Sequence, residues 1–312
     1  MKRQLFAACF AVLAATPASA LNPYAQSPAF YTRETGCSSL HRDAETQIRD
    51  CTEALRGESR PEARHALLAD LGVAYARAAR FNMAMDCFAQ VLSSYPDDWQ
   101  VLLARGTVYM QIERPKEALD DADRALRVKP DFAPLRVLRG GALAMQGKFE
   151  AAILDIDAAI ALSPDDAAGY NVRGMVHGRM GQPALALADY DRAIALSPAP
   201  QFYNNRCFER ATQGSDLAGA LADCNKALEQ GADAQFLDSR GFVYFRMGAY
   251  KAALADYDAA LGKRPGYASS LYMRGMTKQK AGDAKGGDID IAAANAADAK
   301  IAARYASYGV TP

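Results

Sequence analysis

Six cysteines and three histidines are the side chains of this 312-residue chain most able to hold a metal or form a covalent bond. Metal sites usually place such residues at short, repeated spacings such as C-x-x-C. No C-x-x-C occurs, and His41, His65 and His177 share no common register. We therefore expect no metal site, and the cysteines are better read as partners in disulfides or as buried thiols.

Other reactive constellations are also absent from the sequence. There is no G-x-S-x-G, no phosphate-binding loop and no H-E-x-x-H. The numerous aspartates recur at fixed intervals, which indicates a structural role. Lysine plus arginine and aspartate plus glutamate both number 36, so charge gives no reason to expect nucleic acid or an anionic membrane. We expect no catalytic residues, no cofactor and no enzymatic activity.

Glycine, alanine and proline recur with one common period, which reveals the elements that carry these residues. Glycines 34 residues apart mark the register: Gly72, Gly106, Gly140 and Gly174, then Gly241 and Gly275 after one irregular repeat. Twelve residues after five of them come alanines, namely Ala84, Ala118, Ala152, Ala186 and Ala253. Prolines close the same five repeats, namely Pro96, Pro130, Pro164, Pro198 and Pro265.

The residue types suit a helical hairpin. Two helices cross closely only where side chains are small, as at the glycines and alanines. Aromatic side chains such as Phe88, Tyr190 and Tyr257 can fill the space beside them. Proline ends the second helix because it lacks an N–H group. One such pair cannot bury its apolar face alone, so neighbouring pairs are expected to stack.

This pattern resembles the tetratricopeptide repeat (TPR). The resemblance implies an all-α fold, a TPR α-solenoid in which helix–turn–helix repeats form a right-handed superhelix. Six repeats occupy residues 65–267, at 65–98, 99–132, 133–166, 167–199, 200–233 and 234–267. A degenerate seventh repeat and a C-terminal cap fill 268–312, with Gly287 in place of the alanine. Residues 37–64 are interpreted as an N-terminal cap.

The first twenty residues have the three parts of a secretory signal peptide. Lys2 and Arg3 precede an apolar run, and Ala18-Ser19-Ala20 is a small-x-small cleavage site. The run is too short to span a membrane. The sequence predicts a signal peptide at 1–20, a linker at 21–36 and a periplasmic product without a membrane anchor. Cys9 follows a faint lipoprotein-like box, but it lies too early in the chain.

Two cysteine pairs stand out against the repeat positions. In the repeat at 200–233, Cys207 replaces the glycine of position 8 and Cys224 replaces the residue of position 24, across the same hairpin. Cys51 falls at an equivalent of position 24 in the cap, with Cys37 upstream. We expect the disulfides Cys37–Cys51 and Cys207–Cys224, with Cys87 left over. The alternative is five buried thiols.

Arginine at position 7 and aspartate at position 23 occur together in six repeats. The pairs are Arg105 with Asp121, Arg139 with Asp155, Arg173 with Asp189, Arg206 with Asp223, Arg240 with Asp256, and Arg274 with Asp290. The first repeat lacks both and has Leu71 and Cys87 instead. Because the arginine and the aspartate are either both present or both absent in a repeat, we expect an ion pair between the two helices of each repeat that has them. The alternative is a ladder of anion-binding arginines.

In TPR proteins the first helices line the concave face. In the N-terminal half, the positions that point into it carry small or aliphatic residues with few hydrogen-bonding groups, namely Ala69, Val73, Leu103, Thr107, Val137 and Gly141. In the C-terminal half they are amides, aromatics and methionines, and the sequence predicts a peptide-binding groove there from Asn171, Met175, Asn204, Asn205, Phe208, Gln235, Asp238, Phe242, Tyr272 and Met276. The alternative is that these are ordinary helix-surface residues.

Together these features favour a binding function. We expect an exported, non-catalytic scaffold or adaptor that binds a protein or extended peptide, in assembly or maintenance of the cell envelope. The resemblance extends to exported bacterial TPR proteins. The alternatives are a structural protein that self-associates through its caps into a homo-oligomer, and a regulatory subunit of an envelope enzyme.

Overall fold

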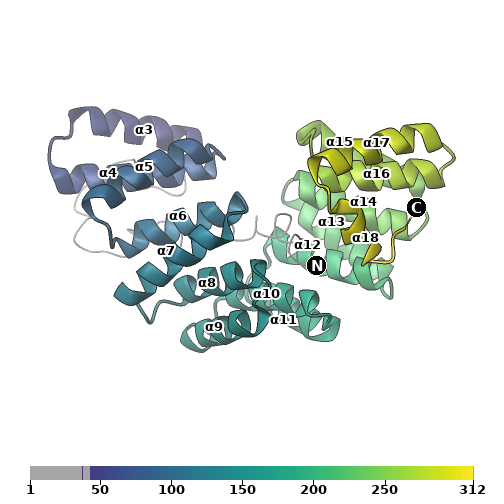
Figure 1. Cartoon of the computed structure of the whole chain (residues 1–312), viewed down its shortest axis with the longest axis horizontal. Coiled ribbons are helices and arrows are strands. Elements are labelled where there is room, and N and C mark those ends of the chain that lie inside the picture. The colour runs from purple at the N-terminus through teal and green to yellow at the C-terminus, as the bar shows by residue number, and fades with distance from the viewer. Residues whose placement is uncertain (1–36, 38–42, 312) are drawn as a thin grey trace. The chain divides into compact units, whose positions relative to one another are not determined.

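The structure is a computed structural model that describes Cys37 and residues 43–311, and these contain helices and no strand. The signal peptide and linker predicted at 1–36 lie outside the described residues. Sixteen helices follow one another along the described chain (Figure 1). Their bounds are α3 (Ala44–Gly57), α4 (Pro61–Arg77), α5 (Phe81–Ser94), α6 (Trp99–Gln111), α7 (Pro115–Val128), α8 (Ala133–Met145), α9 (Phe149–Leu162), α10 (Ala167–Arg179), α11 (Pro183–Leu196), α12 (Pro200–Gln213), α13 (Leu217–Glu229), α14 (Ala234–Arg246), α15 (Tyr250–Lys263), α16 (Ala268–Lys280), α17 (Ala284–Ala297) and α18 (Ile301–Ala306).

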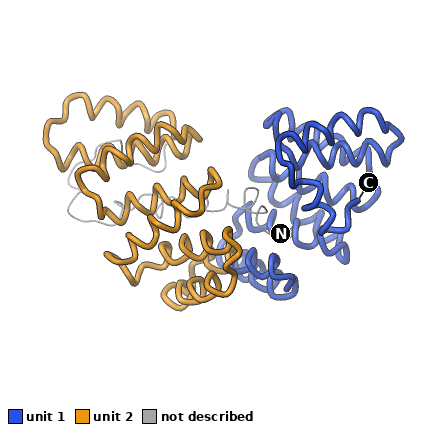
Figure 2. The backbone as a smooth tube through the Cα atoms, in the orientation of Figure 1, with its two compact units in different colours: residues 1–9, 173–312 blue, residues 10–172 orange. Residues whose placement is uncertain are grey.

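Within each of two compact units, consecutive helices pack as antiparallel pairs and neighbouring pairs pack against each other, which is the architecture of a TPR α-solenoid. The boundary between the two units in the sequence falls within α10 (Figure 2). Unit 2 contains α3 to α9 and the start of α10, up to Val172. Unit 1 contains the rest, from Arg173 onward. No helix of the described chain is long and apolar enough to cross a membrane.

Local sequence accounts for the helix ends. Asp98, Asp216, Asp233 and Asp283 cap helices by accepting hydrogen bonds from backbone N–H groups of the first turn. The helix α4 begins at Pro61, four residues before the repeat predicted at 65–98, because proline is well suited to the first helical position.

Five of the six periodic glycines, all except Gly106, make room for a large side chain from the second helix of the same pair. A Cβ atom at Gly241 would lie 2.7 Å from Tyr257 Cε1, and one at Gly140 would lie 2.7 Å from Ile156 Cγ1. These ring and aliphatic side chains are fully buried. The glycine of position 8 and the large residue of position 24 are therefore one packing device.

Gly287 has a packing role that the sequence did not reveal. The alanine position of the seventh repeat was interpreted as degenerate, yet α16 and α17 form a regular hairpin. A Cβ at Gly287 would lie 2.7 Å from the carbonyl oxygen of Gly275 and 2.5 Å from Gln279 Cγ. At Gly140, by comparison, the facing carbonyl of Ala152 would lie 3.1 Å from such a Cβ. In the seventh repeat the two backbones approach too closely for alanine.

Replacing Gly287 by alanine should therefore destabilise unit 1 by about 2 kcal/mol, although alanine is the usual residue of the repeat and a better helix former. The matched control is Gly262→Ala, in the adjacent α15, where a Cβ would meet no atom within 4 Å. The control should stabilise by about 0.5–1 kcal/mol. Urea unfolding midpoints of the two variants measure both effects, and a gain in stability for both would contradict the close approach.

Candidate peptide-binding face

The side chains predicted to line a groove are mostly buried. Asn171 belongs to unit 2 and the other nine to unit 1. Phe208 and Gln235 are partly exposed. The remaining eight are buried, namely Asn171, Met175, Asn204, Asn205, Asp238, Phe242, Tyr272 and Met276. Binding of a partner by these residues stays a prediction, but their exposure in the free protein is lower than the repeat positions suggested.

In unit 1 the cover over this face is the protein's own C-terminal segment, defined here as residues 298–311. The segment follows α17, forms the single-turn helix α18 and crosses the first helices of earlier pairs (Figure 1). Ile301, Tyr305 and Val310 on it are buried in the same core cluster as Phe242 and Tyr272. The sequence assigned this region to a cap, and a cap would need to contact only the last helix pair.

Aromatic rings make most of the contact. Tyr305 stacks on Tyr272 of α16 with ring centroids 5.4 Å apart, and its edge meets Phe242 of α14 at 5.7 Å. Tyr308 meets Phe208 of α12 edge to face at 5.6 Å. Such pairs contribute about 0.5–1.5 kcal/mol each beyond the area they bury. Two tyrosines three residues apart thus reach three successive first helices.

A series of buried hydrogen bonds fixes the position of the Tyr305 hydroxyl. Asp238 accepts hydrogen bonds from the hydroxyls of Ser269 and Ser270, both at 2.6 Å. Because Ser269 gives its proton to Asp238, the Tyr305 hydroxyl donates to Ser269 Oγ. Burial raises the pKa of Asp238 to about 6. At neutral pH the carboxylate is therefore charged and depends on these hydroxyl donors.

All six predicted Arg–Asp pairs are present in the two units. In each pair Nε and a terminal nitrogen of arginine donate to the two carboxylate oxygens, as in Arg105 with Asp121 at 2.8 and 2.7 Å. The other five pairs have the same arrangement. Each arginine is satisfied inside its repeat, which argues against a ladder of anion-binding arginines.

Arg139, Arg206, Arg240 and Arg274 also reach the preceding repeat, which the sequence analysis missed. Their remaining Nη1 donates to position 25 of the previous second helix, at Asp123, Asp191, Asn225 or Asp258. The available signal was an aspartate two residues after the paired one, as in Asp121 and Asp123. One guanidinium therefore links two helices of its own repeat and the neighbouring repeat.

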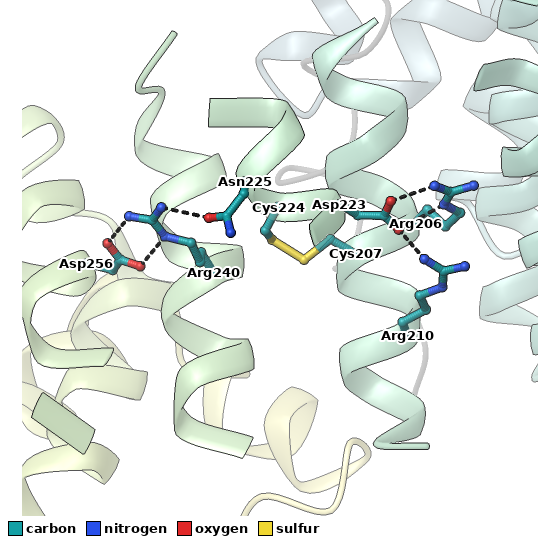
Figure 3. Close-up of a disulfide and its surroundings, with 8 residues drawn as sticks. All are labelled: Arg206, Cys207, Arg210, Asp223, Cys224, Asn225, Arg240 and Asp256. Atoms are coloured by element: carbon teal, nitrogen blue, oxygen red, sulfur yellow. Dashed lines mark hydrogen bonds and ion pairs between the residues drawn. A yellow bond between two sulfur atoms is a disulfide. The ribbon is translucent and has the colours of Figure 1, made fainter. Parts of the chain in front are cut away.

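Both predicted cysteine pairs lie at disulfide distance. Cys207 and Cys224 join α12 to α13 with Cα atoms 5.5 Å apart (Figure 3), and Cys37 joins Cys51 of α3 with Cα atoms 4.8 Å apart. The Cys207–Cys224 bond occupies the place that glycine and a large side chain fill in repeats such as 65–98 and 234–267, with Gly72 and Phe88 or Gly241 and Tyr257. Cys87 is a buried free thiol, and burial raises its pKa to about 11, so it stays protonated and unreactive.

Two histidines lie beside carboxylates, of which His65 shares a hydrogen bond with its neighbour whereas the buried Nδ1 of His177 makes none among the described residues. His65 Nε2 lies 2.6 Å from Asp98 Oδ2, and His177 Nδ1 lies 3.4 Å from Asp189 Oδ2. Each carboxylate already serves another group, as a helix cap or as the partner of Arg173. Within the described chain no three histidine, cysteine or acidic side chains are placed to hold a metal ion.

Unit 2 has a pocket of about 270 Å³ on its first helices α4 and α6, where the sequence analysis expected only small or aliphatic residues without a binding role. Val73 and Thr107, two of those residues, line it together with Phe88. Arg77 and Gln111 supply polar groups at its wall. The buried Oε1 of Gln111 has no hydrogen-bond partner among the described residues. The pocket follows from small side chains on α4 and α6, which leave space between the helices.

Asp70 on α4 is the most unusual ionisable group in unit 2. It is buried and has no hydrogen bond or ion pair within the described chain, and this burial raises its pKa to about 7. An unfolded aspartate has a pKa near 3.9. Between these values the folded protein keeps a proton that the unfolded chain releases, so stability falls as the pH rises from about 4 to 7.

Replacing Asp70 by asparagine should remove that pH dependence. We expect Asp70→Asn to stabilise by about 1–2 kcal/mol at pH 8, because a buried neutral amide costs less than a buried charge, and to change little at pH 4.5. Urea unfolding of wild type and variant at the two pH values measures the difference. An equal effect at both pH values would mean that Asp70 is not charged in the folded protein at pH 8.

Comparison with known proteins agrees with this geometry. Models of the tetratricopeptide repeat match residues 69–131, 103–167 and 167–200. A comparison with curated proteins finds no match.

Solved structures share the fold at low identity. A chain of the APC/C hetero-tetramer Cut9–Hcn1 aligns over 85% of this chain with a TM-score of 0.65 and 17% identity, and this chain spans 52% of its length. A tetratricopeptide repeat protein from Parabacteroides merdae aligns over 75% of this chain and 92% of its own, with a TM-score of 0.62 and 18% identity. IFIT1 with Gppp-AAAA aligns over 79% of this chain and 64% of its own, with a TM-score of 0.59 and 13% identity.

These likenesses show the fold alone. The matched models show that the chain contains tetratricopeptide repeats within residues 69–200, and the paired packing of the helices extends the same fold over the described residues that flank them.

Proposed function

We propose that this chain is an exported, non-catalytic scaffold that binds a protein or peptide in the cell envelope. TPR proteins are generally protein-interaction scaffolds. One observation carries the proposal for this chain: the first-helix face of unit 1 already holds a peptide segment, its own residues 298–311, through aromatic and polar contacts. A surface with this chemistry can recognise another chain.

Export is supported by two independent features. Residues 1–20 read as a signal peptide, and two cysteine pairs lie at disulfide distance. Disulfides persist in oxidising compartments such as the periplasm and are rare in the cytosol. The IFIT1 structure has the same fold and contains Gppp-AAAA. The fold alone therefore does not decide whether this chain binds a protein or a nucleic acid. The balanced charge of this chain favours a protein partner.

Site-specific photocross-linking in envelope extracts tests the proposal. A cross-linking residue at Gln235, partly exposed on the first helix α14, should capture a discrete protein. The same residue at Leu185, exposed on the second helix α11, is the control and should not. Identical products from both positions, or none from Gln235, would contradict binding by the first-helix face. Light scattering of the purified chain tests the alternative of self-association.

A further inference from the structure

We propose that the face formed by α12, α14 and α16 is a binding site for a peptide with two aromatic residues three apart, the first at the end of a short helix and the second in the turn that follows, and that residues 298–311 are its built-in occupant. This inference rests on the proposed function and names the ligand class of that face. A partner carrying the same pattern would have to displace the segment.

The sequence of the segment is a compact recognition pattern, I-x-x-x-Y-x-x-Y-x-V, from Ile301 to Val310. Ile301 and Tyr305 are four residues apart on α18 and share one side of that helix. Tyr308 follows in the turn after the helix, where its N–H donates to the carbonyl of Tyr305. Gly309, with φ 75°, then reverses the chain: its N–H donates to the carbonyl of Ala306, and the N–H of Val310 donates to the carbonyl of Tyr305. The turn directs Val310 back into the core.

The face supplies a matching partner for each group. Tyr305 lies against Tyr272 and Phe242, with its hydroxyl on Ser269. Tyr308 lies against Phe208, and its backbone carbonyl accepts a hydrogen bond of 3.3 Å from Arg246 Nη1. These contacts combine two aromatic sites with one backbone anchor and one buried hydroxyl site. A peptide that binds there must therefore have both the matching aromatic side chains and the matching backbone conformation.

The segment is an occupant and is separable from the repeats that it covers. Its helix has six residues, too few to be stable in water without the face beneath it. It joins α17 through residues 298–300, where Asp298 accepts from Arg304 at 2.6 Å. Its contacts with the face involve none of the six Arg–Asp pairs of the repeats and not the Cys207–Cys224 bond, so it can leave without breaking them. Tyr308 and Phe208 are partly exposed, so a competitor can begin to bind at that edge.

The covalent link between the segment and the repeats determines how much undocking of the segment should change the affinity for a free peptide. A segment joined by a short linker has an effective concentration near millimolar at its own site. A free peptide must compete with it, so its apparent dissociation constant equals the intrinsic constant divided by the fraction of molecules in which the site is free. Undocking the segment should therefore expose the site and tighten binding of a free peptide by about ten- to hundredfold.

The test uses the full mature chain and a fluorescein-labelled peptide of residues 298–311, with anisotropy as the readout. We expect weak binding to wild type, intermediate binding to Tyr308→Ala, and binding about ten- to hundredfold tighter to the double variant Tyr305→Ala/Tyr308→Ala. A peptide with serine at both tyrosine positions should not bind. Adding Phe208→Ala to the double variant should abolish the gain, and adding Leu185→Ala should not.

Three outcomes would overturn the inference: no peptide binding to any variant, equal binding to wild type and variants, or equal binding of the serine peptide. A dimeric wild type in light scattering would also overturn it, because the segment would then be exchanged between copies. If the double variant loses helicity, Tyr308→Ala alone carries the test, since its side chain is already partly exposed. A partner captured at Gln235 would uphold the proposed function even if this peptide failed to bind.

Discussion

Replacing Arg105 by alanine should destabilise unit 2 by about 3–5 kcal/mol, an effect far above that of a surface ion pair. The Asp121 side chain is only 4% exposed, and both of its oxygens accept from Arg105. Burial already raises the pKa of Asp121 above its usual value although Arg105 is present. Without the guanidinium the carboxylate would be buried and unpaired, or would have to take up a proton.

The double variant Arg105→Leu/Asp121→Cys should be far less damaging than Arg105→Ala. It copies the first repeat, where Leu71 and Cys87 occupy the same two positions and are buried. Replacing a buried ion pair by apolar residues is often neutral, because the desolvation cost disappears together with the attraction. We expect a loss within about 1 kcal/mol.

Urea midpoints of wild type, both single variants and the double variant form a double-mutant cycle. The Asp121→Cys single variant leaves Arg105 with 18% of its side chain exposed, so water can solvate it and its loss should be smaller than that of Arg105→Ala. If the double variant lost as much as the sum of the two single variants, the two residues would not interact.

The Arg–Asp pairs could be predicted because the repeats of one chain can be compared with each other. Six repeats have both residues and one has neither, so a physical link was the simplest explanation. The same reasoning identified Cys207 and Cys224, since no other repeat has cysteine at either position. Small residues at helix crossings indicated the fold for a related reason: the packing of each pair is set by local spacing.

The covered face could not be predicted in this way. Repeat positions tell which side chains point toward the first-helix face, but not what lies on top of them. The docking of Tyr305 and Tyr308 depends on Phe208, Phe242 and Tyr272, which come from three different repeats. A tail of about a dozen residues has no period of its own. Gly287 was missed because a residue that departs from the pattern can signal either loss of the repeat or closer packing.

The Cys207–Cys224 disulfide leads to a second large effect. Replacing both cysteines by serine should destabilise unit 1 by about 3 kcal/mol, since the bond closes a loop with a sequence separation of 17. Serine also leaves two hydroxyls at positions where both side chains are fully buried. The loss should appear as a lower urea midpoint under oxidising conditions, and wild type treated with reductant should approach the same midpoint.

A matched variant separates the crosslink from the packing that it replaces. In the first repeat, Gly72 occupies the position of Cys207 and Phe88 that of Cys224, and a Cβ at Gly72 would lie 2.6 Å from Phe88 Cε1. The double variant Cys207→Gly/Cys224→Phe should restore this contact. Burying a phenylalanine side chain contributes about 1.5–3 kcal/mol, so the variant should recover about half of the loss and should be indifferent to reductant.

The direction of this rescue tests what the cysteines do in the repeat. If the bond substitutes for the glycine–aromatic contact, the glycine–phenylalanine variant must be more stable than the serine variant in the presence of reductant. Equal stability of those two variants would mean that the slot between α12 and α13 does not accept the ring, and that the irregular repeat depends on its crosslink alone. Wild type that is unaffected by reductant would show that the bond does not stabilise unit 1.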